Sequence, residues 1–155
     1  MRKEQLEALE RIAQGPGNIG HEEMQRVYYT EKYVYATDGR VIFRLANDTN
    51  IVTPEEGGRP YPCVVLDHFL SDSGIDKRYV EINTDVERIL NDMELCIIGN
   101  DCYDAEKIRN AMVILGSDVT AWENRQERFR GLHLESKAGK GLILPVRLIG
   151  NDDLS

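Results

Sequence analysis

Residues 33–45 read Tyr-Val-Tyr-Ala-Thr-Asp-Gly-Arg-Val-Ile-Phe-Arg-Leu. Aromatic and β-branched residues, which favour strands, stand on both sides of the Asp38-Gly39 dipeptide. Asp-Gly is typical of the two-residue turn that joins the strands of a β-hairpin. The pattern therefore predicts a hairpin with one strand ending before Asp38 and the next running from Val41 to Leu45.

Two segments outside this hairpin carry apolar residues at helical spacing. The first predicts a helix over residues 2–14, which Gly15-Pro16-Gly17 ends. The second predicts a helix over residues 105–115, with Asp104 as its N-cap and Gly116 at its C-terminal end.

Most of the remaining chain has the composition of short strands joined by polar loops. We predict strands at residues 61–66, 79–82, 93–98, 118–123, 129–135 and 141–148, and one helical turn at 84–87, where Thr84 and Glu87 have capping-box spacing. Residues 47–60 are polar and predict a long exposed loop.

Two helices and about eight strands predict the α+β class, with antiparallel sheets and both helices on one face. Because the order of helix and strands occurs twice, an internal duplication is a hypothesis. We expect a single domain over residues 1–149, with halves at about 1–91 and 92–149, and a C-terminal tail at 150–155.

The composition excludes several classes of protein. A chain of 155 residues that is 41% hydrophobic and 30% charged is neither a disordered tail nor a membrane protein. The apolar stretches are much shorter than the roughly 20 residues of a membrane span, and no signal-peptide core follows the N-terminus. Three cysteines without Cys-x-x-Cys spacing predict reduced thiols, so we expect a cytoplasmic protein that does not associate with membranes.

The motifs that suggest catalysis lack their required context. Residues 15–20 match Gly-x-Gly-x-x-Gly, but they follow a helix and not a strand, which excludes dinucleotide binding. His21-Glu22 lacks the second histidine of a zinc-protease helix. We therefore expect a protein that is not an enzyme and uses no cofactor or metal; a small hydrolase using Asp67 or His68 is the least favoured alternative.

Four segments, taken in order, resemble the bacterial DNA polymerase III beta sliding clamp family. They are Tyr35–Arg40 followed by Leu45, similar to its "ATDGxR-L" hairpin; Thr84–Leu90, similar to "PDYxRVLP"; Tyr103–Ala111, similar to "FDAKYLRDAL"; and Leu144–Leu148, similar to "MPVRL". The resemblance spans residues 26–149 and covers one clamp domain, whereas the family protein carries three domains per chain.

The resemblance implies a DNA-clamp fold, in which helices face double-stranded DNA and sheets join edge to edge between neighbouring domains. A single domain would have to form a homo-oligomer to encircle a duplex. The implied function is that of a sliding-clamp-like processivity or accessory factor in DNA replication or repair. The cations expected to face DNA are Arg2, Lys3, Arg11, Lys107 and Arg109.

The charge of the two helices and of the whole chain bears on this expectation. Acids equal bases on each helix, and the chain has a net charge of −8, which opposes unspecific coating of nucleic acid. Two ordinary solvated helix faces are therefore the favoured interpretation of these residues. The alternative function is a protein- or peptide-interaction module on a clamp scaffold that does not bind DNA.

The resemblance also implies an apolar pocket that captures short peptides of polymerases and clamp loaders. The implied pocket residues are Thr37, Gly39, Arg40, Leu45, Leu144, Pro145, Val146 and Arg147. In the family, the two motifs that meet there come from different domains, so we expect them to meet here only across a contact between subunits. The same positions can instead be a hairpin tip and a closing core strand.

Overall fold

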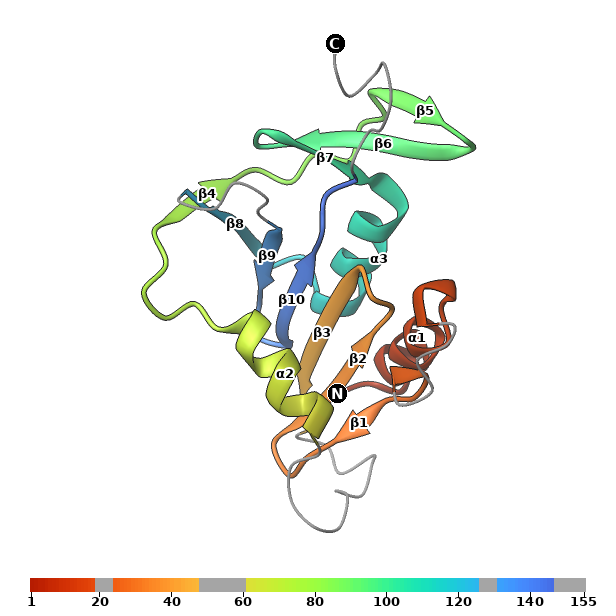
Figure 1. Ribbon diagram of the computed structural model, residues 1–155, viewed down its shortest axis with the longest axis vertical. Helices are drawn as coiled ribbons and strands as arrows, with labels where there is room; N and C mark the ends of the chain where they lie inside the picture. The colour runs from red at the N-terminus through yellow and green to blue at the C-terminus, as the bar shows by residue number, and fades with distance from the viewer. Residues whose placement is uncertain (19–23, 48–60, 126–130, 147–155) are drawn as a thin grey trace.

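The computed structural model describes residues 1–18, 24–47, 61–125 and 131–146 (Figure 1). Its described part is a mixed α+β structure, which confirms the expected class. The helices are α1 (Lys3–Ala13), α2 (Tyr61–Leu70) and α3 (Ala105–Leu115), with a short 3-10 helix η1 (Pro16–Asn18) after α1. The strands are β1 (Tyr28–Tyr29), β2 (Tyr33–Thr37), β3 (Val41–Ala46), β4 (Lys77–Val80), β5 (Arg88–Leu90), β6 (Met93–Ile98), β7 (Asp101–Asp104), β8 (Thr120–Asn124), β9 (Leu132–Glu135) and β10 (Gly139–Ile143).

The strands form two antiparallel sheets. The larger sheet has the order β1-β2-β3-β10-β9-β8-β4, and the smaller has the order β5-β6-β7. Strand β10 lies between β3 and β9, with Ile143 opposite Val41. The predicted hairpin therefore lies inside the larger sheet, next to its central strand β10, and its tip lies beside the end of β10.

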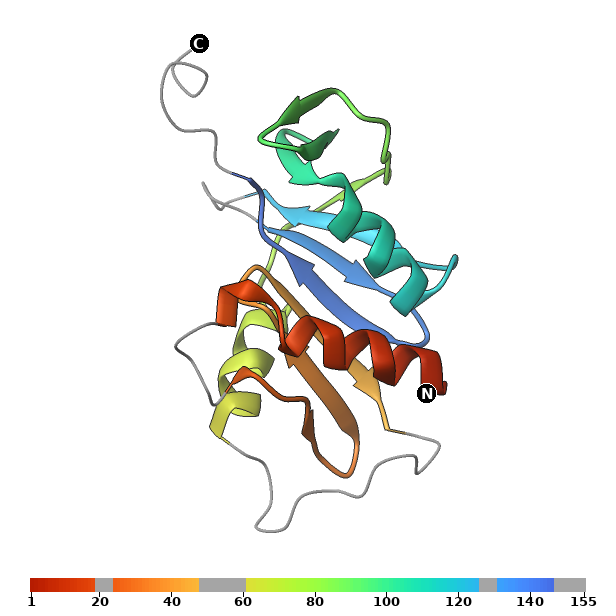
Figure 2. The same ribbon diagram turned by 90° about the vertical axis from the view of Figure 1, so that its right-hand side faces the viewer.

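Helices α1 and α3 lie side by side on one face of the larger sheet (Figure 2). The Gln5 Nε2 atom, near the start of α1, donates a hydrogen bond of 2.8 Å to the carbonyl oxygen of Ile114, near the end of α3. The helices therefore run antiparallel. Buried Leu9 and Ile108 pack with Phe43 in the core between these helices and the sheet, so the expectation that the two helices share one face is confirmed.

Helix α2 covers the opposite face of the larger sheet. The prediction of a strand at residues 61–66 is therefore wrong. Cys63 and Leu66 of this helix pack against Tyr28 and Tyr35 of the sheet. The helix forms because Cys63, Leu66 and Leu70 are apolar residues at helical spacing, and all three are buried. The β-branched Val64-Val65 pair, which favoured a strand, lies between these buried positions.

Several smaller predictions also need correction. Residues 84–87 form no helical turn but an irregular segment, in which the Asn83 Oδ1 atom accepts a hydrogen bond of 2.9 Å from the backbone N–H of Asp85. Strands β5 and β7 were not predicted. Three residues, 38–40, separate the hairpin strands, where two were expected.

The other expected helices and strands are present, most of them with shifted boundaries, whereas the expected loop (residue 47 apart) and the expected tail at 150–155 lie outside the described ranges. Strands β4, β8, β9 and β10 overlap the predicted segments at 79–82, 118–123, 129–135 and 141–148, whose residues 129–130 and 147–148 lie outside the described ranges. The Asp104 side chain caps α3 by accepting a hydrogen bond from the Glu106 N–H, and Gly116 ends the helix with a φ of 99°. In the described ranges, none of the helices has the length and apolar character needed to cross a membrane.

Candidate functional site

The tip of the β2–β3 hairpin is held by hydrogen bonds from its own side chains. The Asp38 Oδ1 atom accepts bonds of 2.8 Å from the backbone N–H groups of Arg40 and Val41. The Thr37 hydroxyl accepts a bond of 3.1 Å from the Gly39 N–H and donates one of 2.7 Å to the Val41 carbonyl. Gly39 has a φ of 87°, a backbone conformation that glycine adopts without strain. The tip is therefore a preorganised turn.

The segment that follows β10 runs directly beside this tip. The Leu144 N–H donates a hydrogen bond of 2.9 Å to the Arg40 carbonyl, and the Val146 N–H donates one of 2.8 Å to the Cys102 carbonyl of β7. The expectation that the two motifs meet only across a subunit contact is wrong, because β10 pairs with β3 and brings Leu144 to the hairpin tip of its own chain.

A cavity of about 440 Å³ lies between this tip, the segment after β10 and helix α2. We call it the α2 cavity. Phe69 and Leu144 line it with exposed fractions of 53% and 45%, which is large for apolar side chains. The α2 cavity is lined by Gly17, Asn18, Met24, Thr37, Gly39, Arg40, Ile42, Val65, Leu66, Phe69, Leu142 and Leu144.

A second cavity, of about 390 Å³, lies on the other side of the hairpin tip and is called here the β5 cavity. It shares Gly17, Arg40 and Leu144 with the α2 cavity. Its further lining residues are Asp38, Leu90, Asn91, Met93, Asp104, Lys107 and Val146. Leu144 is therefore exposed to two adjoining hollows.

The structure distributes the expected peptide-binding residues unevenly. Thr37, Gly39, Arg40 and Leu144 line the α2 cavity, and Val146 lines the β5 cavity. Leu45 lies in the main core with 1% of its surface exposed, because it points to the α1 face of β3. Pro145 is half-buried and lines neither cavity, and Arg147 lies outside the described residues.

The sequence interpretation missed the contribution of α2. Val65 and Phe69 line the α2 cavity one helical turn apart, and Met24 joins them from the chain after η1. The missed signal is the helical spacing of the buried residues Cys63, Leu66 and Leu70, which places Val65 and Phe69 on a neighbouring stripe of the helix.

The cations expected to face DNA are exposed on or just before α1, whereas those on α3 pair with carboxylates. Arg2, Lys3 and Arg11 are exposed on or just before α1. On α3, the Lys107 Nζ atom lies 2.7 Å from Asp38 Oδ2, and the Arg109 Nη1 atom lies 3.0 Å from Glu94 Oε1. The positive charge of α3 is therefore largely offset by carboxylates.

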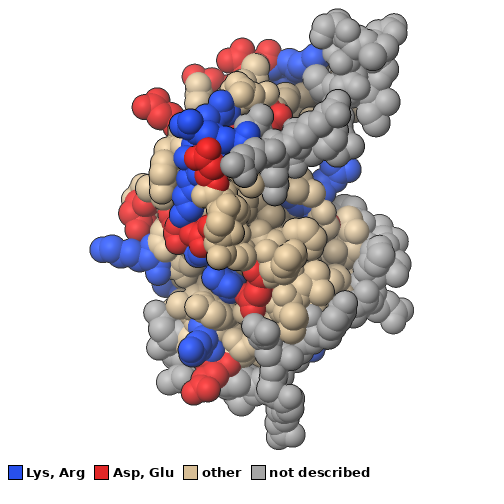
Figure 3. Space-filling model, turned by 60° about the vertical axis from the view of Figure 1, so that its left-hand side comes forward, with Lys and Arg blue, Asp and Glu red and all other residues tan. Residues whose placement is uncertain are grey.

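Charge of both signs is also mixed on another face of the molecule. On the face that Figure 3 shows, lysine and arginine side chains alternate with aspartate and glutamate along the left side, and other described residues fill the centre. The described residues on this face therefore do not form a large patch of one sign, which would steer a polyanion.

The polar residues near α2 are engaged in structural contacts. The Asp67 Oδ1 atom accepts hydrogen bonds from Arg44 Nη1 at 2.7 Å and from the Tyr35 hydroxyl at 2.9 Å. Burial, reinforced by the bond to Asp67, raises the pKa of Tyr35 far above its usual value. Across the described ranges, no cluster of three or more His, Cys, Asp or Glu side chains could hold a metal ion.

Comparison with known proteins gives no match to a protein-family model, to a curated protein or to a solved structure. The described residues form two adjoining hollows at the hairpin tip, and carboxylates offset Lys107 and Arg109 of α3. An apolar hollow with a few polar groups around it is the usual form of a binding site.

Proposed function

We propose that this protein is a non-enzymatic peptide-binding module built on a DNA-clamp-type fold. The clamp-type fold is supported by the four segments that resemble the bacterial clamp family and by the adjacent α1 and α3 on one face of the sheet. The peptide-binding role is carried by one observation: the α2 cavity gathers Thr37, Gly39, Arg40 and Leu144, together with the exposed Phe69, in a single chain.

The chemistry of the α2 cavity indicates the kind of peptide that it takes. Apolar atoms of α2, β3 and β10 line the hollow, so a large apolar side chain such as leucine or phenylalanine enters it. Arg40 lines the same hollow, is exposed, and forms no ion pair with a described carboxylate. An acidic residue next to the apolar anchor would therefore pair with Arg40. Segments of polymerases or clamp loaders are the partners that the family resemblance suggests.

Selection of binders from a pool of random peptides, followed by fluorescence anisotropy on the best of them, tests this proposal. We expect the selected peptides to combine leucine or phenylalanine with a neighbouring acidic residue. Leu144→Ala should weaken them about tenfold, as is typical of an exposed apolar contact at the centre of an interface. Val64→Ala is the matched control. Val64, on α2, is an exposed apolar residue like Leu144, but it lines neither hollow. Equal affinity in both variants would reject the α2 cavity as the site.

A second candidate function is that of a sliding-clamp-like processivity or accessory factor. It is favoured by the adjacent helices α1 and α3 and by the exposure of Arg2, Lys3 and Arg11 on or just before α1. Because one domain cannot encircle a duplex, this function requires a homo-oligomeric ring. The carboxylates that offset Lys107 and Arg109 weaken it.

Titration of labelled duplex DNA at two salt concentrations separates the two functions. A clamp that touches several phosphates should lose affinity steeply between about 50 and 200 mM salt, because binding releases condensed counterions. The double variant Arg2→Gln/Lys3→Gln should then bind more weakly and with a shallower salt dependence. Absence of binding at both salt concentrations would exclude the clamp function and leave the peptide-binding module as the remaining candidate.

A further inference from the structure

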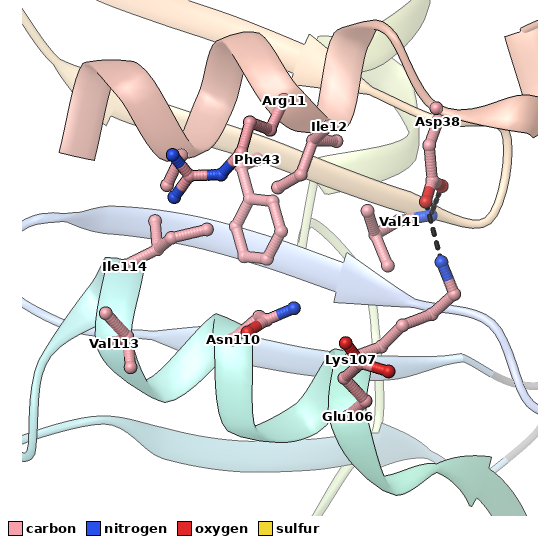
Figure 4. Close-up of a pocket in the computed structure, with 12 residues that line it drawn as sticks. Arg11, Ile12, Asp38, Val41, Phe43, Glu106, Lys107, Asn110, Val113 and Ile114 are labelled. Atoms are coloured by element: carbon pink, nitrogen blue, oxygen red, sulfur yellow. Dashed lines mark hydrogen bonds and ion pairs between the residues drawn. The ribbon is translucent and has the colours of Figure 1, made fainter. Parts of the chain in front are cut away.

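The α2 cavity differs from the other large hollows in the charge of its lining. Arg40 is the one charged side chain among the described residues that line it. The β5 cavity has two cationic and two acidic lining residues, and so does a third hollow, of about 450 Å³, between α1 and α3 (Figure 4). In this third hollow, Lys107 pairs with Asp38, and Glu106 lies beside Lys107. An acidic segment is therefore attracted more strongly to the α2 cavity than to the other two.

The α2 cavity also presents apolar surface to the solvent. Phe69 and Leu144 are both exposed there. In contrast, Phe43 of the third hollow is only 1% exposed, because it belongs to the main core. An apolar side chain that covers Phe69 and Leu144 removes apolar surface from water on both partners. The α2 cavity therefore suits an apolar residue that stands next to an acidic one.

The chain itself contains a segment of this composition a few residues after the described part. Residues 152–154 read Asp-Asp-Leu. They combine two carboxylates with one large apolar side chain. A carboxylate is the natural partner of the Arg40 guanidinium, and the leucine matches the exposed apolar lining of the cavity.

This segment is attached close to the α2 cavity. The described chain reaches Val146, which lines the β5 cavity together with Leu144, and Leu144 lines the α2 cavity as well. Eight residues lead from Val146 to Leu154, and an extended chain of this length reaches about 26 Å. Gly150 and Asn151 are of residue types that favour turns, so the chain can reverse its direction there.

We propose that residues 152–154 occupy the α2 cavity of their own chain and compete there with peptide partners. Leu154 lies against Leu144, and the carboxylate of Asp153 pairs with Arg40. A segment tethered this closely has an effective concentration on the order of 1 mM. With an intrinsic Kd of about 100 µM, it weakens the apparent affinity for a partner about tenfold. This inference rests on the proposed peptide-binding role of the α2 cavity and adds its regulation.

Competition on the full chain tests the proposal. The double variant Asp153→Asn/Leu154→Ala, called here the segment variant, keeps the chain length but removes the two groups that fill the cavity. A peptide selected for the α2 cavity should bind it about tenfold more tightly than the wild type in fluorescence anisotropy. Asp85→Asn/Val86→Ala is the matched control and should bind like the wild type, because it makes the same chemical changes at an exposed pair that lines neither hollow.

Backbone amide chemical shifts measured by NMR report occupation of the cavity without any partner. Outside residues 147–155, the largest differences between the wild type and the segment variant should fall at Gly39, Arg40 and Phe69. A synthetic peptide of residues 147–155, added to the segment variant, should shift the same amides with half-saturation near about 100 µM. The wild-type shifts should not depend on protein concentration, because the contact forms within one chain.

The other outcomes separate this inference from the peptide-binding role itself. Equal affinity of the selected peptide for the wild type and the segment variant would overturn competition by residues 152–154. The peptide-binding role would still stand if Leu144→Ala weakened that peptide, and would fall with the inference if it did not. Wild-type shifts that change with protein concentration would place the segment in a second copy and reject occupation within one chain. Amide spectra of each variant without peptide show whether its fold is retained.

Discussion

Glu123 of β8 is a completely buried acidic residue. Its carboxylate contacts two polar side chains. Its Oε1 atom lies 2.5 Å from Arg78 Nη2 of β4, and its Oε2 atom accepts a hydrogen bond of 3.3 Å from the Tyr103 hydroxyl of β7. Gly99 lies so close that an added Cβ would be 2.1 Å from Glu123 Oε1. Glu123 therefore connects the larger sheet with the β6–β7 hairpin.

Replacing Glu123 by glutamine should destabilise the protein by about 3 kcal/mol, because Arg78 loses its buried counter-charge while its own charge remains. Urea unfolding followed by far-ultraviolet circular dichroism measures the difference. Glu81→Gln, at an exposed position after β4, is the matched control and should change stability by less than about 0.5 kcal/mol. A loss of less than about 1 kcal/mol in the Glu123 variant would show that this ion pair is not needed to join the sheets.

His133 is the described histidine whose titration should affect stability. Its ring stacks on Trp122 at a centroid distance of 4.0 Å, in a position that leaves it 9% exposed. Burial first, and then the nearby Lys140, lowers the pKa of His133 from 6.5 to about 4, while Asp72 opposes this change and Lys77 adds to it. The folded protein therefore holds this histidine neutral at a pH where the unfolded chain is already protonated.

This difference predicts that stability is lost as the pH falls from 6.5 towards 4, by up to about 1.4 kcal/mol per pH unit. His133→Phe keeps a ring against Trp122 but cannot take up a proton. The decrease in unfolding free energy between pH 7 and pH 5 should be smaller in this variant than in the wild type by about 1 to 2 kcal/mol. Equal decreases in the two proteins would contradict the role of His133.

At the scale of elements, the sequence correctly predicted the helices and strands in which the spacing of apolar residues and the turn or cap residues agree with the packing of the folded chain. The β2–β3 hairpin, α1 and α3 formed as expected, since each combines a clear period with a turn or cap residue such as Asp104. Helix α2 was missed because Val64-Val65 favours a strand. The folded chain forms a helix there, since Cys63, Leu66 and Leu70 stand at helical spacing and all three are buried.

Two further tight turns could have been recognised from their residue types. Asn91 and Asp92, with φ of 51° and 65°, join β5 to β6, and Gly99-Asn100 joins β6 to β7. Asn-Asp and Gly-Asn are residues that accept positive φ in two-residue hairpin turns. The meeting of Leu144 with the hairpin tip was beyond sequence reasoning, because it depends on the pairing of β10 with β3 across nearly one hundred positions of chain.

Gly17 of η1 lies against the backbone of the hairpin tip. A Cβ at Gly17 would lie 1.8 Å from the Asp38 carbonyl oxygen, whereas a Cβ at Gly74 meets nothing within 4 Å. Gly17→Ala should therefore force the two segments apart and cost about 2 kcal/mol, the usual range for overpacking. Because Gly17 lines both the α2 and β5 cavities, peptide affinity should fall as well.

Gly74→Ala is the control for this variant. Gly74 has a φ of 73°, so its replacement adds backbone strain of about 1 kcal/mol but no collision. Thermal unfolding and the anisotropy of a selected peptide measure both effects. Retained peptide affinity in Gly17→Ala would show that the α2 cavity adapts without a fixed contact between η1 and the tip.

At the scale of the whole molecule, the larger sheet determines how copies of the chain could associate. Its outer strands in the described structure are β1 and β4. Strand β1 has only two residues, while β4 has four and carries Tyr79, which is 66% exposed. Outer strands of a sheet offer unpaired backbone groups to another chain, and charged side chains discourage such pairing.

A ring of clamp-type domains would use these strands, so self-association should depend on β4. If the protein forms such a homo-oligomer, sedimentation velocity should show a mass that rises with protein concentration, and Tyr79→Lys should remain monomeric because a lysine opposes pairing along the strand. Val64→Lys places the same charge on an exposed apolar position of α2 and should associate like the wild type. A wild-type protein that stays monomeric at every concentration would exclude a ring made by this chain alone. Peptide capture in the α2 cavity would then remain as a function that one copy performs, because all the described residues that line the cavity belong to one chain.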